Sequence, residues 1–188
     1  MSELWKQIAA ANQAFLKQSE SRGGLQPMDK YPSRRLAVLT CMDTRLVDFL
    51  EPAMGLHRGE AKIIKVAGNM AGEEFDSVVG SLMVAVYELR VRDIIVMGHD
   101  CCGMLNTTSD SLCRKMAEAG IGEDAIAAIR PKLAAWADPI GNIDESVQCT
   151  VHHLRSNPYL PKTVSIYGMA IHPDTGKIRI IDDGACRN

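Results

Sequence analysis

Apolar and polar residues follow two different rhythms along this chain. Three short segments are almost continuously apolar: residues 35–40 (RLAVLT), 61–69 (AKIIKVAGN) and 92–99 (RDIIVMGH). Runs of this length and composition are typical of strands buried on both faces of a parallel sheet. Two further strands are expected at 162–171 and 177–182, and the segment between them (HPDTG) is a reasonable hairpin turn.

Between these strands the apolar residues recur every three or four positions, which is typical of helices. The pattern predicts a helix over 73–89 and three more around 103–118, 122–137 and 142–156. Pro131 must bend or divide the helix that contains it. An amphipathic helix is also expected near the start of the chain, with Ser2 as its N-cap, before the Gly/Pro-rich connector SRGGLQPMDKYPS.

Strands that alternate with helices predict an α/β fold with right-handed connections. The expected architecture is a mostly parallel central sheet flanked by helices, with a C-terminal antiparallel edge hairpin. The pattern contains no repeat, low-complexity tract or domain linker, so residues 1–188 are expected to form a single domain, with residues 1–20 as an N-terminal arm helix.

Composition and charge exclude several classes of function. The net charge of −2 gives no electrostatic case for binding nucleic acid or an anionic membrane. No apolar run approaches the roughly 18 residues of a membrane helix, and the N-terminus lacks the apolar region of a signal peptide. We therefore expect a cytoplasmic protein. In that setting, its cysteines are expected to be thiols or metal ligands rather than disulfides: Cys41, Cys101, Cys102, Cys113, Cys149 and Cys186.

Metal-ligating residues follow two of the predicted strands. Cys41 ends the first strand, and His99 ends the third, closely followed by Cys101 and Cys102. The carboxyl ends of neighbouring parallel strands meet at one sheet edge, where α/β proteins bind ligands. Two thiolates and an imidazole are ligands that Zn²⁺ prefers, in the three-ligand set of an open catalytic site. Zinc would lower the pKa of a bound water to about 7 and make hydroxide available at neutral pH.

Asp43 and Arg45 follow Cys41 at intervals of two residues, which can place all three on one side of an extended turn. Arg45 would keep the carboxylate of Asp43 ionised and hold its oxygens in a fixed plane. Such a carboxylate can accept a hydrogen bond from a zinc hydroxide and orient it toward a substrate. It could also swing onto the zinc and close the site. The alternative is a plain salt bridge.

The motif CMDTR, followed by HDCCG 58 positions after its cysteine, resembles the β-class carbonic anhydrases and their pattern Cys-x-Asp-x-Arg, then His-x-x-Cys. The resemblance extends over roughly residues 34–182, including IIKVAGN, the helix after it and the Thr-Gly hairpin, and the short chain resembles the compact branch. The resemblance implies that Cys41, His99 and Cys102 are the zinc ligands and that Asp43 and Arg45 are the catalytic pair. It also implies that Asp43 binds zinc only in a closed form of the site.

The resemblance also implies an activity and an assembly. The activity is that of a zinc lyase, the reversible hydration of carbon dioxide to bicarbonate and a proton. The assembly is a homodimer or a homotetramer in which the N-terminal helix embraces a neighbouring subunit. Leu39 stands where one bacterial subgroup has the tryptophan of an inhibitory bicarbonate pocket, and His172 where an aspartate is expected.

Several alternatives remain open. Relatives on the same scaffold hydrolyse carbonyl sulfide or carbon disulfide, and a non-catalytic zinc-binding member is a further possibility. A thiol-redox role would rest on the adjacent pair Cys101 and Cys102, but adjacent cysteines form strained disulfides. Residues favoured for structural or surface roles are Cys101, Cys113, Cys149, Cys186, His57, His152 and His153. AGNMAG lacks the spacing of a phosphate-binding loop and is interpreted as a tight turn.

Overall fold

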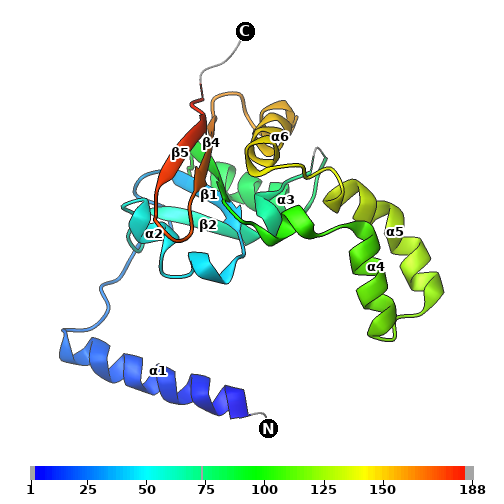
Figure 1. The fold of residues 1–188 in the computed structure, drawn as a ribbon. Coiled ribbons are helices and arrows are strands. Elements are labelled where there is room, and N and C mark those ends of the chain that lie inside the picture. The colour runs from blue at the N-terminus through cyan, green and yellow to red at the C-terminus, as the bar shows by residue number, and fades with distance from the viewer. Residues whose placement is uncertain (1–2, 73, 185–188) are drawn as a thin grey trace.

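The computed structural model describes residues 3–72 and 74–184 of the chain. Its centre is a five-stranded sheet in the order β2-β1-β3-β4-β5 (Figure 1). Strands β1, β2, β3 and β4 run parallel, and β5 pairs antiparallel with β4 at the edge. The predicted fold class is therefore confirmed. The strands are β1 Leu36–Cys41, β2 Ala61–Val66, β3 Asp93–His99, β4 Ser165–Ile171 and β5 Ile178–Asp182.

Burial on both faces is confirmed for β1 and β3, whereas β2 lies at the edge of the sheet and none of its residues is fully buried, so the prediction for residues 61–69 was wrong in that respect. In β1 every residue after Leu36 is buried, and the last four residues of β3 are buried as well. The hairpin between β4 and β5 turns at His172, whose carbonyl accepts hydrogen bonds from the N–H groups of Thr175 and Gly176. Gly176 has a φ of 72°, which glycine adopts without steric cost.

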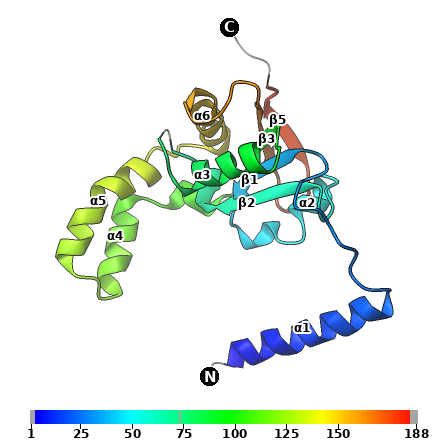
Figure 2. The same ribbon diagram turned by 180° about the vertical axis from the view of Figure 1, so that it is seen from behind.

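The helices flank this sheet. α6 packs against β3 and β4, α3 contacts β2, and α4 and α5 form a helical hairpin that projects from the body (Figures 1 and 2). The helices are α1 Glu3–Ser21, α2 Leu50–Ala53, α3 Ser77–Met83, α4 Ser109–Glu118, α5 Glu123–Ala137 and α6 Ile143–Ser156. The π-helical turn η3 Val84–Glu88 continues α3, and short 3-10 turns are η1 Thr44–Leu46, η2 Ala67–Asn69 and η4 Gly103–Asn106.

Two of the predicted helices begin at other residues in the structure. The helix expected from residue 73 begins at Ser77, because the side chain of Asp76 caps it by accepting from the N–H of Val79. The segment 103–118 divides into η4 and α4, since Thr108 forms a capping box with Ser111. α5 is one helix through Pro131, so the proline does not divide it.

α6 lies very close to the sheet because two strands present glycine to it. An added Cβ on Gly98 of β3 would lie 2.7 Å from Val147 Cγ2 and 3.0 Å from Ile143 Cγ2. A Cβ on Gly168 of β4 would lie 2.8 Å from Val147 Cγ1. The absence of side chains at these two positions therefore sets how near α6 sits to the end of β3.

α1 stands away from the rest of the molecule (Figures 1 and 2). None of its described side chains is buried, although it carries large apolar residues: Leu4, Trp5, Ile8, Phe15 and Leu16. The proposed N-cap, Ser2, lies outside the described residues. Across the part of the chain that the structure describes, no helix combines the length and apolar character needed to cross a membrane.

Candidate metal centre

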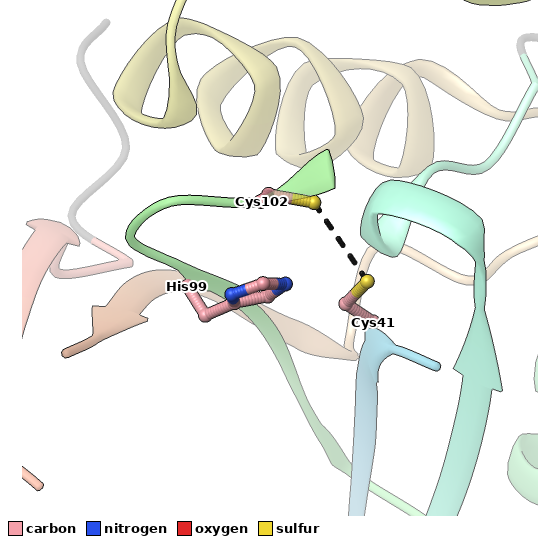
Figure 3. Close-up of side chains that lie close together, drawn as sticks. All are labelled: Cys41, His99 and Cys102. Atoms are coloured by element: carbon pink, nitrogen blue, oxygen red, sulfur yellow. Dashed lines mark hydrogen bonds between the residues drawn. The ribbon is translucent and has the colours of Figure 1, made fainter. Parts of the chain in front are cut away.

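Parallel pairing of β1 with β3 places the three predicted metal ligands together. Cys41 is the last residue of β1, and His99 is the last residue of β3. Cys102 follows three residues later, as the N-cap of η4. Figure 3 shows the two sulfur atoms and the imidazole ring turned toward one common point. Their ligand atoms all lie within 4.8 Å of one another, and the two Sγ atoms are 3.8 Å apart.

The cluster is shielded from solvent. Cys41 is 5% exposed, Cys102 3% and His99 0%. The main-chain carbonyl of Asp100 lies 3.0 Å from Nδ1 of His99, so Nδ1 carries the proton and donates it. Nε2 is then left with a lone pair, and within residues 3–72 and 74–184 it has no hydrogen-bond partner. A buried nitrogen of this kind is costly unless something binds it.

The two thiols hold their protons very unequally. A hydrogen bond from Cys102 is the main reason that the pKa of Cys41 falls to about 4, although burial opposes the change. The thiolate of Cys41, together with burial, raises the pKa of Cys102 above its usual range. Burial is the largest single influence on His99 and lowers its pKa, but the interactions with Cys41, Asp100 and Asp43 together raise that pKa above its usual value. The cluster therefore holds one negative charge easily and resists a second without a cation.

The turn η2 supports Cys41 from the neighbouring strand. The main-chain N–H groups of Gly68 and Asp43 both lower the pKa of Cys41 by stabilising its thiolate. Gly68 has a φ of 67°, and an added Cβ would lie 3.1 Å from Met104 Cγ. Only glycine fits there without strain. AGN is thus a tight turn beside the cluster, as the sequence predicted.

Asp43 and Arg45 form a closely joined pair beside the cluster. Oδ1 of Asp43 accepts from the main-chain N and from Nε of Arg45, both at 2.9 Å, and Oδ2 accepts from Nη2 at 2.8 Å. The guanidinium holds the pKa of Asp43 well below its usual range. Oδ2 also lies 3.7 Å from Nε2 of His99, so the carboxylate faces the cluster. Arg45 in turn donates to the carbonyl of Cys101 at 2.9 Å.

The donor set fits zinc. Two sulfurs and one imidazole nitrogen are the ligands expected of a catalytic zinc site with a fourth position for water, and the orphaned Nε2 of His99 gives a specific reason for a metal here. Within the described ranges no second group of three such residues lies close enough to hold a metal. Cys101 is exposed, has a φ of 55°, and does not belong to the cluster.

The remaining candidates lie elsewhere. Cys113 is buried in the α4–α5 region, as a structural cysteine should be, and His57 lies in an exposed loop. Cys149 is exposed rather than packed in the core, with Sγ 3.4 Å from Nε2 of His153 one helical turn on. Cys186 falls outside the described residues. One further contact near the cluster, between Arg179 of β5 and Asp100 beside His99, was not predicted from the sequence.

Comparison with known proteins agrees with this geometry. A family model described as carbonic anhydrase matches residues 36–178, which includes all five residues of the cluster and the adjoining pair. The chain belongs to the β-carbonic anhydrase family. Members of this family are zinc enzymes, and the chain is accordingly an enzyme of the carbonic anhydrase type.

Individual relatives cover nearly the whole chain. The crystal structure of β-carbonic anhydrase isoform I from Trichomonas vaginalis superposes with a TM-score of 0.92 at 43% identity, over 98% of this chain and 100% of that one. Putative carbonic anhydrase YvdA of Bacillus subtilis is 37% identical over 94% of this chain and 90% of its own length. A carbon disulfide hydrolase of Acidithiobacillus thiooxidans is 28% identical, over 78% of this chain and 77% of its own.

Proposed function

We propose that this β-carbonic anhydrase family member catalyses the reversible hydration of carbon dioxide to bicarbonate and a proton, with Zn²⁺ held by Cys41, His99 and Cys102. The observation that carries the proposal is the position of Asp43. Its carboxylate is bound by Arg45 and lies 3.7 Å from Nε2 of His99, which has no hydrogen-bond partner among the described residues. A site built simply to hold a metal has no need of an oriented carboxylate at that place.

Each residue of the site has a definite task. Bound zinc would supply a Lewis acid that lowers the pKa of a water ligand to about 7. Cys41 and Cys102 would balance the charge of the cation as thiolates. Asp43 would accept a hydrogen bond from the reacting water at Oδ2, which aims an oxygen lone pair at the carbon of the substrate. Addition of that oxygen to carbon dioxide would form the new C–O bond while one C=O double bond opens to a C–O⁻ single bond, and one proton of the water would leave to solvent, so that bicarbonate and a proton are the products.

Arg45 would serve this step by keeping Asp43 ionised and fixed. Its three hydrogen bonds occupy both carboxylate oxygens, so rotation of Asp43 about its side chain requires breaking all of them. We propose that this pairing favours the open form of the site. In the closed form, Asp43 would leave Arg45 and take the fourth position on zinc.

A second candidate is hydrolysis of carbon disulfide or carbonyl sulfide. The observation that favours it is the 28% identity to a carbon disulfide hydrolase on the same scaffold. These molecules are linear and electrophilic at carbon like carbon dioxide, so the same ligands and the same Asp43 would serve. A non-catalytic, zinc-binding role is a third candidate, which the paired Asp43 and Arg45 argue against.

The proposed enzyme works as a homo-oligomer, at least a dimer. α1 exposes a large apolar surface, formed by Leu4, Trp5, Ile8, Phe15 and Leu16. A helix with no buried side chain gains little stability by itself and needs a partner surface. A second copy of the chain is the partner that we propose.

A stopped-flow assay on protein of known zinc content tests the proposed reaction. We expect about one zinc per chain and rapid hydration of carbon dioxide, lost in Cys41→Ser and in His99→Ala. Carbon disulfide and carbonyl sulfide are run in parallel, with released sulfide measured. Sulfide release without hydration would favour the second candidate, and zinc-loaded wild-type protein inactive on all three would contradict both.

A further inference from the structure

An arginine on the edge strand contacts the loop that joins two of the proposed zinc ligands, His99 at the end of β3 and Cys102. Nη1 of Arg179, in β5, donates to Oδ2 of Asp100 at 2.8 Å. Asp100 stands directly between His99 and the Cys101–Cys102 pair. The side chains of Arg179 and Asp100 are 38% and 27% exposed, so this ion pair is partly shielded from water.

A second carboxylate anchors the same guanidinium. Oδ1 of Asp144, in the first turn of α6, accepts from Nη2 of Arg179 at 2.6 Å and from Nε at 3.2 Å. The planar guanidinium thus joins α6, β5 and the loop after β3. Two charge-assisted contacts in different directions fix such a group more firmly than one flexible pair would.

Asp100 is consequently held at both its side chain and its main chain. Its N–H donates to the carbonyl of Ile171, at the end of β4, at 3.0 Å. Its own carbonyl is then presented to Nδ1 of His99 at 3.0 Å. Because a carbonyl can only accept, this contact places the proton of the imidazole on Nδ1. The lone pair of Nε2 then faces Cys41 and Cys102.

We propose that Arg179 is a positioning residue for His99, acting through Asp100 to fix the orientation and the protonated nitrogen of the imidazole ring. The inference rests on the metal site of the proposed function. Partners that orient a metal-ligating histidine typically change metal affinity 10–100-fold when they are removed. The side-chain hydrogen bonds of Arg179 go to Asp100 and Asp144 and not to the cluster, so we expect its effect on zinc binding to pass through Asp100.

The chain offers a matched control. Arg155 of α6 joins the same two elements as Arg179, because it donates to both carboxylate oxygens of Asp182 in β5, at 2.8 and 2.6 Å. It also donates to the carbonyl of Ile166. None of these contacts involves residues 100–102, the segment that joins His99 to Cys102. Arg155→Ala therefore removes an α6–β5 ion pair without removing the restraint on Asp100.

The experiment compares zinc affinity in the full-length protein, measured by competition with a chelator. We expect Arg179→Ala to weaken zinc binding about 10–100-fold, and Arg155→Ala to lower the thermal midpoint while leaving zinc affinity within about twofold. Arg179→Lys should recover part of the affinity, because lysine keeps the charge but not the fork that spans two carboxylates. Asp100→Asn, which preserves the shape of the loop, provides the test if Arg179→Ala does not fold.

Nitrogen NMR of the imidazole gives a readout that general destabilisation would not change. In zinc-loaded wild type, His99 should carry its proton on Nδ1, and Arg179→Ala should show faster exchange of that proton with solvent. Equal zinc affinity in wild type, Arg179→Ala and Asp100→Asn would overturn the inference, and so would equal weakening by Arg155→Ala. Wild type that binds zinc without hydrating carbon dioxide would contradict the proposed reaction alone, and wild type that binds no zinc would contradict both.

Discussion

Arg45 donates a hydrogen bond from Nη2 to the main-chain carbonyl of Cys101, 2.9 Å away. The same nitrogen also binds Oδ2 of Asp43. One guanidinium group therefore connects the loop after β1 with the loop after β3, beside the strand ends and the residue that provide the three proposed zinc ligands. Arg45 fixes the relative position of these loops as well as the charge of Asp43, and its removal should have consequences of both kinds.

Arg45→Gln should shift the acid limb of the activity profile to higher pH. Arg45 holds the pKa of Asp43 below its usual range, so the carboxylate stays ionised well into acid. Without the guanidinium, the pKa of Asp43 rises toward the ordinary value of about 4. As the pH is lowered, Asp43 is then protonated at a higher pH than in the wild type. kcat/KM for hydration, measured against pH, tests the shift, and Arg114→Gln on the exposed face of α4 is the control. An unchanged acid limb would mean that Asp43 does not limit the rate there.

Cys101→Ser and Cys102→Ser should differ sharply in zinc content. The side chain of Cys102 is buried in the cluster, whereas that of Cys101 is exposed and lies outside it. We expect Cys101→Ser to keep about one zinc per chain after dialysis, and Cys102→Ser to lose most of it. Elemental analysis of both purified proteins provides the measurement. The reverse order would exclude Cys102 as a ligand.

Gly98→Ala should destabilise the protein by about 1–3 kcal/mol, because the added methyl group has no room against α6. Its Cβ would lie 2.7 Å from Val147 Cγ2. Gly122→Ala is the matched control, since an added Cβ at Gly122 meets nothing within 4 Å. Urea denaturation followed by circular dichroism compares the two free energies of unfolding. Similar losses in both variants would show that the contact between α6 and β3 relaxes easily.

The α4–α5 hairpin should lose stability in acid through Asp138. This carboxylate accepts from the main-chain N and Oγ of Ser109, both at 2.7 Å, and the main-chain donor is the larger cause of its lowered pKa. Because the pKa of Asp138 is lower in the folded state than in the unfolded state, the ionised carboxylate stabilises the fold. This stabilisation is fully present above the unfolded-state pKa of about 4 and is lost as the pH falls through the folded-state pKa. Asp138→Ala should therefore lower the thermal midpoint at pH 7 and do so less below pH 4. A pH-independent difference would point to packing instead.

Removal of residues 1–21 should reduce the size of the assembly. The deletion takes away the apolar surface of α1, while the described core of the sheet lies elsewhere. Sedimentation velocity of the full-length and shortened proteins compares their masses, and Lys17→Gln serves as a control on the polar side of the helix. An unchanged mass would place the subunit interface away from α1.

Local patterns in the sequence predicted most of the architecture and the candidate ligands. The strands were recognisable because β1 and β3 are buried on both faces and so are apolar almost without interruption. Cys41 and His99 could be paired because each ends such a strand, and parallel strands end at a common edge. Both inferences use information that lies within a few residues of the position in question.

Contacts between distant residues were not predictable in the same way. Arg179 lies 79 positions from Asp100, and an isolated charged residue in an edge strand is most simply a solvated side chain. The start of α3 was also misplaced, because apolar spacing continues through Phe75 although Asp76 caps the helix after it. In both cases the deciding interaction belongs to one side chain, and a periodic pattern carries no information about it.

The Cys41–His99–Cys102 cluster exists only while β1 and β3 are paired. Cys41 and Cys102 are 61 positions apart, and β1 and β3 bring them together as parallel neighbours. A parallel pair requires a long crossover, so this contact closes a large loop, and we expect it to form later than the local helices. Zinc release from the proposed site would consequently report on the centre of the fold: during unfolding, its time course compared with the loss of helical signal would show when β1 and β3 separate.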